Sequence, residues 1–130
     1  MFKLVDLDHV AITVSDLQRS IEWYQSVLGM ERRHQEVWPD VPAFMCLRNT
    51  GVALFPANTT QPAVAPDSAT HRTMRHFAFR ADWEDFRKAQ DTLRGRGIPF
   101  HFQDHGIAHS IYFSDPDGHQ LEITTYELPK

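Results

Sequence analysis

The 130-residue sequence has little of several features that mark particular classes of protein. Its one cysteine, Cys46, excludes an intrachain disulfide, so a reducing cytoplasm is the expected compartment. No apolar run approaches the roughly 20 residues of a membrane span, and the first residues lack the apolar core of a signal peptide. The 13 basic residues are outnumbered by 17 acidic ones, and this net charge of −4 disfavours a nucleic acid or an anionic membrane as partner.

The overall composition is that of one small folded domain. Hydrophobic residues make up 42% of the chain and charged residues 23%, which argues against disorder. A chain of this length corresponds to one domain, or to two small modules that share a core. Histidine is unusually frequent, with eight copies. Some of these histidines are therefore candidates for metal ligation or acid–base chemistry.

The hydrophobic pattern predicts short strands and two helices. Helical spacing of apolar residues is found over residues 17–28 and about 82–97, and Gly29 and Gly97 supply helix stops. Ser15 and Gln18 form a candidate capping box for the first helix, and Asp82 opens the second. Alternating or continuous apolar runs bounded by turn residues predict strands over residues 7–14, 32–38, 43–47, 52–55, 74–81, 100–103, 110–114 and 120–126.

The order strand, helix and three strands occurs twice, which indicates an internal repeat. His76 follows His9 by 67 positions, and Glu122 follows Phe55 by the same number. We therefore expect an α+β fold with a single domain over residues 1–130, built from two βαβββ modules at about 5–56 and 74–127. Residues 57–73 are rich in Thr, Ala and Pro and have no periodicity, so they are expected to form a linker or a lid.

Strand parity places three ligand-type side chains on sheet faces that point away from the helices. His9, His76 and Glu122 each alternate with apolar neighbours that must face the helices. Two imidazoles and one carboxylate suit Fe(II), Mn(II) or another divalent ion and leave coordination positions open. The alternative interpretation is three unrelated polar residues on solvated sheet faces.

Three segments together resemble one known superfamily: LDHVAITVSDLQRSIEWYQSVLGM, MRHFAFRA and HSIYFSDPDGHQLEI. Over about residues 7–126 the chain resembles the vicinal oxygen chelate superfamily, which includes glyoxalase I, extradiol dioxygenases, fosfomycin-resistance thiol transferases and bleomycin-binding proteins. The resemblance implies paired βαβββ modules that form a curved mixed sheet around a metal site, with the helices on the outer face.

The same resemblance implies which residues bind the metal. The superfamily takes its ligands from the first and last strands of each module, positions that fall here on His9, Phe55, His76 and Glu122. Phe55 cannot bind a metal, so three side chains would hold the ion. Fe(II) or Mn(II) is the expected cofactor, with Zn(II), Ni(II) or Co(II) as alternatives.

The missing fourth ligand favours the members with three-ligand sites. The extradiol dioxygenase pattern of His, Tyr and Glu fits His105, Tyr112 and Glu122. In that pattern the Tyr112 phenol hydrogen-bonds the bound substrate, and His105 orients the substrate or shuttles a proton. The leading expectation is an extradiol-type ring-cleaving dioxygenase that acts on a small catecholic substrate. A packed aromatic and an exposed loop histidine are the alternatives for these two residues.

Other members of the superfamily remain as alternative functions. A glyoxalase-like lyase or isomerase is one. A thiol transferase is another; these enzymes share the segment around Tyr112, but they resemble a pattern with Thr and Lys where this chain has Ala11 and Phe102. A non-enzymatic drug-binding protein is the third, and the intact ligand set argues against it, because a pure binder does not need metal ligands.

Substrate contacts and assembly are also suggested by the sequence. Trp38, Phe44 and Arg48 fall on predicted strands of the first module and could line an aromatic substrate pocket, with Arg48 holding an anionic group. Core packing and a solvated Arg are the alternative. A homodimer is expected, because four modules are common in the superfamily. The sequence leaves open whether His9 and His76 meet within one chain or across two.

Overall fold

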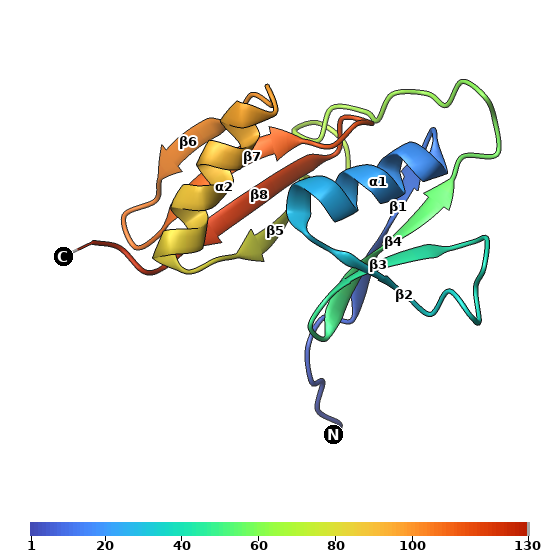
Figure 1. Ribbon diagram of the computed structural model, residues 1–130, viewed down its shortest axis with the longest axis horizontal. Coiled ribbons are helices and arrows are strands. Elements are labelled where there is room, and N and C mark those ends of the chain that lie inside the picture. The colour runs from blue at the N-terminus through green and yellow to red at the C-terminus, as the bar shows by residue number, and fades with distance from the viewer. Residues whose placement is uncertain (130) are drawn as a thin grey trace. The chain divides into compact units, whose positions relative to one another are not determined.

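The computed structural model describes residues 1–129 and divides the chain into two compact units, with the boundary between Ala63 and Val64. Within the described residues, each unit contains one helix and one four-stranded sheet (Figure 1). The boundary lies inside the segment 57–73 that was expected to be a linker. The predicted α+β class and the repeated βαβββ order are confirmed.

The first unit packs its helix on a mixed sheet. β1 (His9–Val14) pairs in parallel with β4 (Thr50–Pro56), and β4 pairs antiparallel with β3 (Ala43–Leu47). β3 in turn pairs antiparallel with β2 (Glu31–Arg33) at the edge. α1 (Leu17–Leu28) contacts β3, β4 and β2 and covers one face of the sheet.

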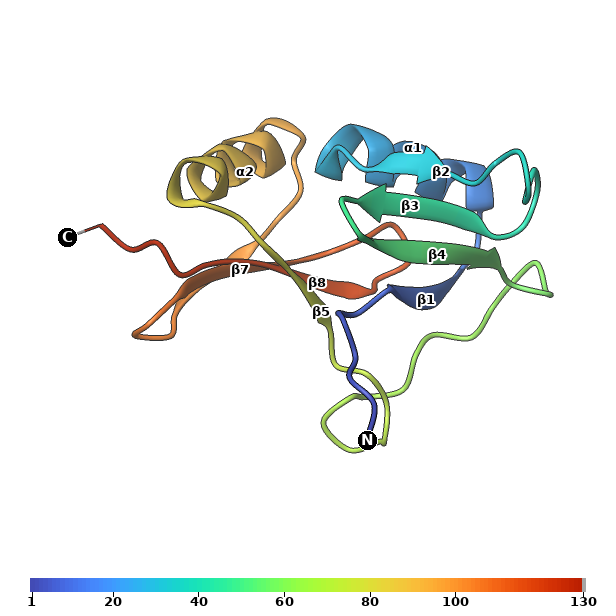
Figure 2. The ribbon, with the colours of Figure 1, turned by 90° about the horizontal axis from the view of Figure 1, so that it is seen from below.

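The second unit repeats this arrangement. β5 (Phe77–Arg80) pairs in parallel with β8 (Gln120–Thr125), and β8 pairs antiparallel with β7 (His109–Ser114). β7 pairs antiparallel with β6 (His101–Asp104) at the edge. α2 (Trp83–Gly95) lies on one side of this sheet, as Figure 2 shows. The other face of each sheet is therefore left without a helix of its own unit.

Both helices begin at an aspartate cap. The Asp16 carboxylate accepts from the Arg19 amide at 3.0 Å, and the Asp82 carboxylate accepts from the Asp85 amide at 2.7 Å. The predicted cap at Ser15 was therefore one residue too early, whereas the cap at Asp82 is confirmed. Gly29 ends α1 in the left-handed conformation, with φ of 66°. Among residues 1–129 neither helix has the length and apolar character needed to cross a bilayer.

One predicted strand is much shorter in the structure. The sequence predicts a strand over residues 32–38, but β2 ends at Arg33. The cause is His34, whose φ of 63° turns the backbone into the left-handed region. The His34 carbonyl then accepts from the amides of Val37 and Trp38, at 3.1 and 2.8 Å. Trp38 consequently lies in a loop rather than on a strand.

Strand parity separates the helix-facing side chains from those on the opposite face as predicted. Ile12 and Val14 of β1 are buried, whereas His9 is exposed on the opposite face. On β8, Leu121 and Ile123 are buried on the helix side, and Glu122 points to the other face. The faces without helices therefore carry the polar side chains that were singled out from the sequence.

Candidate metal site and substrate pocket

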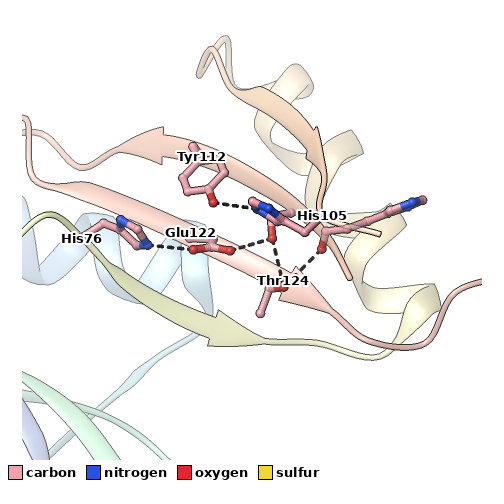
Figure 3. Close-up of polar contacts among 7 residues, drawn as sticks. His76, His105, Tyr112, Glu122 and Thr124 are labelled. Atoms are coloured by element: carbon pink, nitrogen blue, oxygen red, sulfur yellow. Dashed lines mark hydrogen bonds and ion pairs between the residues drawn. The ribbon is translucent and has the colours of Figure 1, made fainter. Parts of the chain in front are cut away.

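The second unit brings two of the predicted metal ligands into contact. His76 Nε2 lies 2.8 Å from Glu122 Oε1 (Figure 3). The parallel register places Ala78 opposite Glu122, and His76, two residues before Ala78, shares its face of the sheet. The Glu122 side chain is only 11% exposed, so its carboxylate depends on these protein contacts rather than on water.

The second oxygen of Glu122 is also held. Ser110 Oγ donates to Glu122 Oε2 at 2.6 Å, and it lies 3.0 Å from Thr124 Oγ1. Thr124 Oγ1 donates to the carbonyl oxygen of His109 at 3.3 Å. Ser110 is fully buried, which fixes the orientation of the carboxylate. We did not select Ser110 from the sequence, although its place on the same face as Tyr112, two residues away, was the signal available.

The two predicted catalytic residues are also together. His105 Nε2 lies 2.9 Å from the Tyr112 hydroxyl, and the Tyr112 ring meets the His76 ring edge-on at 5.5 Å between centroids. Burial raises the pKa of the Tyr112 phenol, and the negative charge of Glu122 raises that pKa further. Tyr112 therefore keeps its proton at neutral pH and can donate it in a hydrogen bond.

The third predicted ligand, His9, belongs to the first unit. Its Nδ1 lies 2.8 Å from Asp8 Oδ2. A carboxylate on Nδ1 favours the tautomer with a lone pair on Nε2, an arrangement common among metal-binding histidines. In this tautomer Nε2 of His9 has the free lone pair that a metal ligand requires.

The donor chemistry fits a divalent ion. Among residues 1–129 no group of three or more His, Cys, Asp or Glu side chains is clustered, so the His76–Glu122 pair is the part of the predicted set that the structure brings together. An imidazole nitrogen and a carboxylate oxygen that converge within 2.8 Å, with the carboxylate braced by Ser110, match the ligands such ions prefer.

The candidate substrate residues gather around one pocket in the first unit. Trp38, Phe44 and Arg48 line a pocket of about 280 Å³ together with His9. The rings of His9 and Phe44 meet edge-on at 5.3 Å. The pocket is further lined by Asp8, Arg33, His34, Cys46, Asn49 and Thr50. One candidate ligand and the three candidate substrate contacts are therefore neighbours.

Strand register corrects the position assigned to the fourth family ligand. Counting along the sequence placed it at Phe55, but Phe55 pairs with Thr13 in β1. Glu122 pairs with Ala78, which follows its histidine by two residues, and the residue that pairs with the corresponding Ala11 is Ala53. The vacant position is therefore Ala53, whose methyl group cannot bind a metal either.

Strand register also shows what lies opposite Phe102, the residue that stands where the thiol transferases resemble a pattern with Lys. In the structure Phe102 pairs with buried Ile111, whereas the residue opposite Tyr112 is His101. Phe102 therefore shares the helix side of the sheet, and the His101 imidazole lies on the face of Tyr112.

Comparisons with known proteins agree with this architecture. The sequence profile of the Glyoxalase/Bleomycin resistance protein/Dioxygenase superfamily matches residues 6–123. The chain is 31% identical over 120 residues to Glutathione transferase FosA of Serratia marcescens, covering 92% of this chain and 80% of that protein. It is 30% identical over 132 residues to Metallothiol transferase FosB of Staphylococcus epidermidis, covering 97% and 85%. The crystal structure of a glyoxalase/dioxygenase from Nostoc punctiforme superposes with a TM-score of 0.79 at 24% identity, over 96% of this chain and 92% of that one.

These relatives favour the thiol-transferase alternative over the ring-cleaving dioxygenase that we expected. FosA and FosB are transferases by name, and the Nostoc structure, at 24% identity, bears on the fold alone. The expected catechol cleavage, oxidoreductase class and iron have no support in them. The spacing of His105, Tyr112 and Glu122 places a phenol near a carboxylate, and this arrangement is not specific to dioxygenases. The repeated strand order and the match over residues 6–123 show that the chain belongs to the Glyoxalase/Bleomycin resistance protein/Dioxygenase superfamily.

Proposed function

We propose that the protein is a divalent-metal-dependent thiol transferase that joins a thiol to a small electrophilic substrate. The observation that carries the proposal is the His76–Glu122 contact of 2.8 Å beside the phenol of Tyr112, which retains its proton. The choice of a thiol as co-substrate rests on the names of the FosA and FosB relatives, because one is a glutathione transferase and the other a metallothiol transferase.

In this proposal His9, His76 and Glu122 would hold the ion. The set of two imidazoles and one carboxylate suits several divalent ions, and the relatives give no reason to prefer iron. When bound, the ion would supply a Lewis acid that polarises a substrate oxygen. Ser110 and Asp8 would orient the ligands Glu122 and His9 from behind, through the 2.6 and 2.8 Å hydrogen bonds described above.

Tyr112 would supply the proton that the reaction consumes. The thiol sulfur forms a bond to a substrate carbon, the carbon–oxygen bond at that carbon breaks, and its electron pair remains on the oxygen. The Tyr112 hydroxyl donates a proton to this oxygen. Tyr112 regains a proton through His105, whose Nε2 lies 2.9 Å away and whose ring is exposed to solvent. The proton lost by the thiol balances the one gained by the product.

A panel of small epoxides with glutathione or cysteine tests the reaction. Metal-loaded protein is expected to form thioether adducts that mass spectrometry detects. Tyr112→Phe is expected to lower turnover on the order of 10²-fold while the metal content is unchanged. Dioxygen uptake with catechols, in the absence of any thioether product, would contradict the proposal.

We also propose that the protein is a homodimer, which raises the question of which chain supplies His9. Refolding an equal mixture of His9→Ala and His76→Ala chains answers it. If His9 and His76 meet across two copies, random pairing restores about a quarter of the sites, because half of the dimers are mixed and each carries one intact set. If they meet within one chain, the mixture binds no more metal than the separate variants.

A further inference from the structure

The pocket of the first unit has an aromatic wall. The Trp38 and Phe44 rings lie 6.1 Å apart with a tilted geometry, and His34 meets both edge-on at 5.6 and 5.8 Å. Trp38 nevertheless remains 40% exposed, so a large part of its apolar surface is left in contact with solvent. A flat apolar ligand that covered this surface would remove from water both its own face and the exposed face of Trp38, and this burial would favour binding.

Two strained residues fix the shape of this wall. His34 and Arg48 are the non-glycine residues with positive φ in the part of the chain that the structure describes, at 63° and 47°, and both line this pocket. The left-handed His34 makes the turn that brings Trp38 back toward Phe44. Arg33 Nη1 donates to the Arg48 carbonyl at 2.6 Å and so holds the second strained residue. Strain of this kind is concentrated at ligand-binding sites, where neighbouring contacts maintain it.

The charged residues around the pocket differ in whether they already have a partner. Asp8 is occupied by its hydrogen bond to His9, and Arg33 lies 3.6 Å from Glu31. Within residues 1–129, by contrast, no carboxylate pairs with the exposed Arg48 guanidinium. A guanidinium binds a carboxylate with two parallel hydrogen bonds, and this one is available to a ligand.

We infer that this pocket binds the aromatic carboxylate portion of the substrate. One planar ring lies against Trp38 and Phe44, and its carboxylate pairs with Arg48. The volume of about 280 Å³ lies just below the roughly 300–1,000 Å³ typical of sites for drug-sized ligands, so it accommodates one ring with its substituent rather than several fused rings. The inference deepens the proposed function, since it names the chemical class of the electrophile, and it rests on that proposal for the ligand's role as substrate.

Benzoate is the probe that tests this inference. The full-length, metal-free protein is titrated with benzoate and with benzamide, which has the same shape without the charge, and binding is followed by calorimetry and by the indole NMR signal of Trp38. Benzoate is expected to bind about tenfold or more tightly than benzamide, the contribution of one charge-assisted hydrogen-bonded pair. Cyclohexanecarboxylate and methylphosphonate test the ring and the kind of anion, and both are expected to bind more weakly.

Two variants locate the binding site. Arg48→Gln retains a side chain at the strained position and is expected to abolish the preference for benzoate over benzamide. Trp38→Ala is expected to weaken both ligands about equally. Arg87→Gln removes an exposed arginine from α2 of the second unit and should change neither affinity. Circular dichroism confirms that each variant is folded.

Several outcomes would overturn the inference. Equal affinity for benzoate and benzamide would remove Arg48 from the site, and equal affinity for methylphosphonate would make it a general anion site. Absence of saturable benzoate binding to folded protein would remove the site altogether. The titration uses neither metal nor thiol, so its result does not depend on whether thiol transfer is observed. Likewise, a failure of benzoate binding does not change what the metal and transfer assays show.

Discussion

The hydroxyl of Ser110 provides the sharpest test of the proposal that Glu122 is held in place to bind a metal. Ser110 Oγ donates to Glu122 Oε2 at 2.6 Å in a fully buried position. Ser110→Ala removes the donor and leaves one carboxylate oxygen without its partner in a place that water reaches poorly. The carboxylate is then free to rotate away from the orientation in which Oε1 meets His76.

The expected loss of metal affinity is large because the acceptor of the Ser110 hydrogen bond, the Glu122 carboxylate, is charged. A hydrogen bond to a charged group contributes about 1.5–3 kcal/mol, and losing the partner that orients a metal ligand typically lowers metal affinity 10–100-fold. Since tenfold corresponds to about 1.4 kcal/mol, the two estimates agree. We therefore expect Ser110→Ala to raise the Kd for Mn(II) or Zn(II) about 10–100-fold.

Competition with a chromogenic chelator measures this Kd, and Ser114→Ala is the matched control. Ser114 lies on the same strand and the same face, but its hydroxyl accepts from Gln120 Nε2 at 2.8 Å rather than bonding Glu122. The control should bind metal as the unmodified protein does. A change of less than about threefold in Ser110→Ala, or an equal change in both variants, would show that Ser110 does not orient the metal ligand.

Three further predictions concern the strand register, the phenol and a helix cap. Phe55→Glu should leave the metal Kd unchanged, because Phe55 pairs with Thr13, and a tightened Kd in chelator competition would restore Phe55 as a ligand position. The raised pKa of Tyr112 means that its contribution to stability is complete below the ordinary tyrosine pKa of about 10 and is lost as the pH rises through the higher folded value. Tyr112→Phe should therefore flatten the alkaline decline of urea midpoints, and superimposable curves would refute this. Asp82→Ala removes the bond to the Asp85 amide and should cost about 1 kcal/mol of unfolding free energy in urea, whereas an unchanged midpoint would show that the cap contributes nothing.

Local alternation was enough to predict which faces carry the site. Val10 and Ile12 had to point toward the helix, so His9 had to point away from it, and the same reasoning placed Glu122 opposite Leu121. The contact between His76 and Glu122 agrees with these placements. The contact between His105 and Tyr112 was not predicted, because His105 lies in a loop, where alternation along a strand gives no direction. Side-chain direction along a strand depends only on the backbone period, which the sequence displays directly.

Which residues pair between neighbouring strands was not predictable by counting residues along the sequence. His9 stands seven residues before the cap Asp16, whereas His76 stands six before the cap Asp82, so the two units do not share one constant offset. Tertiary contacts set the register of each sheet, and that register moved the vacant ligand position to Ala53.

The hydrophobic pattern of the sequence also did not predict the conformation of the turn after β2 or the class of reaction. The left-handed conformation of His34, which is uncommon for a non-glycine residue, shortened β2 and placed Trp38 in a loop. The dioxygenase expectation has no support in the named relatives, and the reason is a different one. A phenol beside a carboxylate is shared by several chemistries, and the sequence spacing does not distinguish among them.

The metal content of purified variants tests the central claim most directly. Elemental analysis of the unmodified protein, dialysed after loading with Mn(II) or Zn(II), should give about one ion per chain, since one set of two histidines and one carboxylate holds one ion. His9→Ala, His76→Ala and Glu122→Gln should each lose most of it. His71→Ala, which alters an exposed histidine of the segment between the two sheets, should retain it. Unchanged metal stoichiometry in folded His76→Ala protein would contradict the proposed site and, with it, the metal-dependent function.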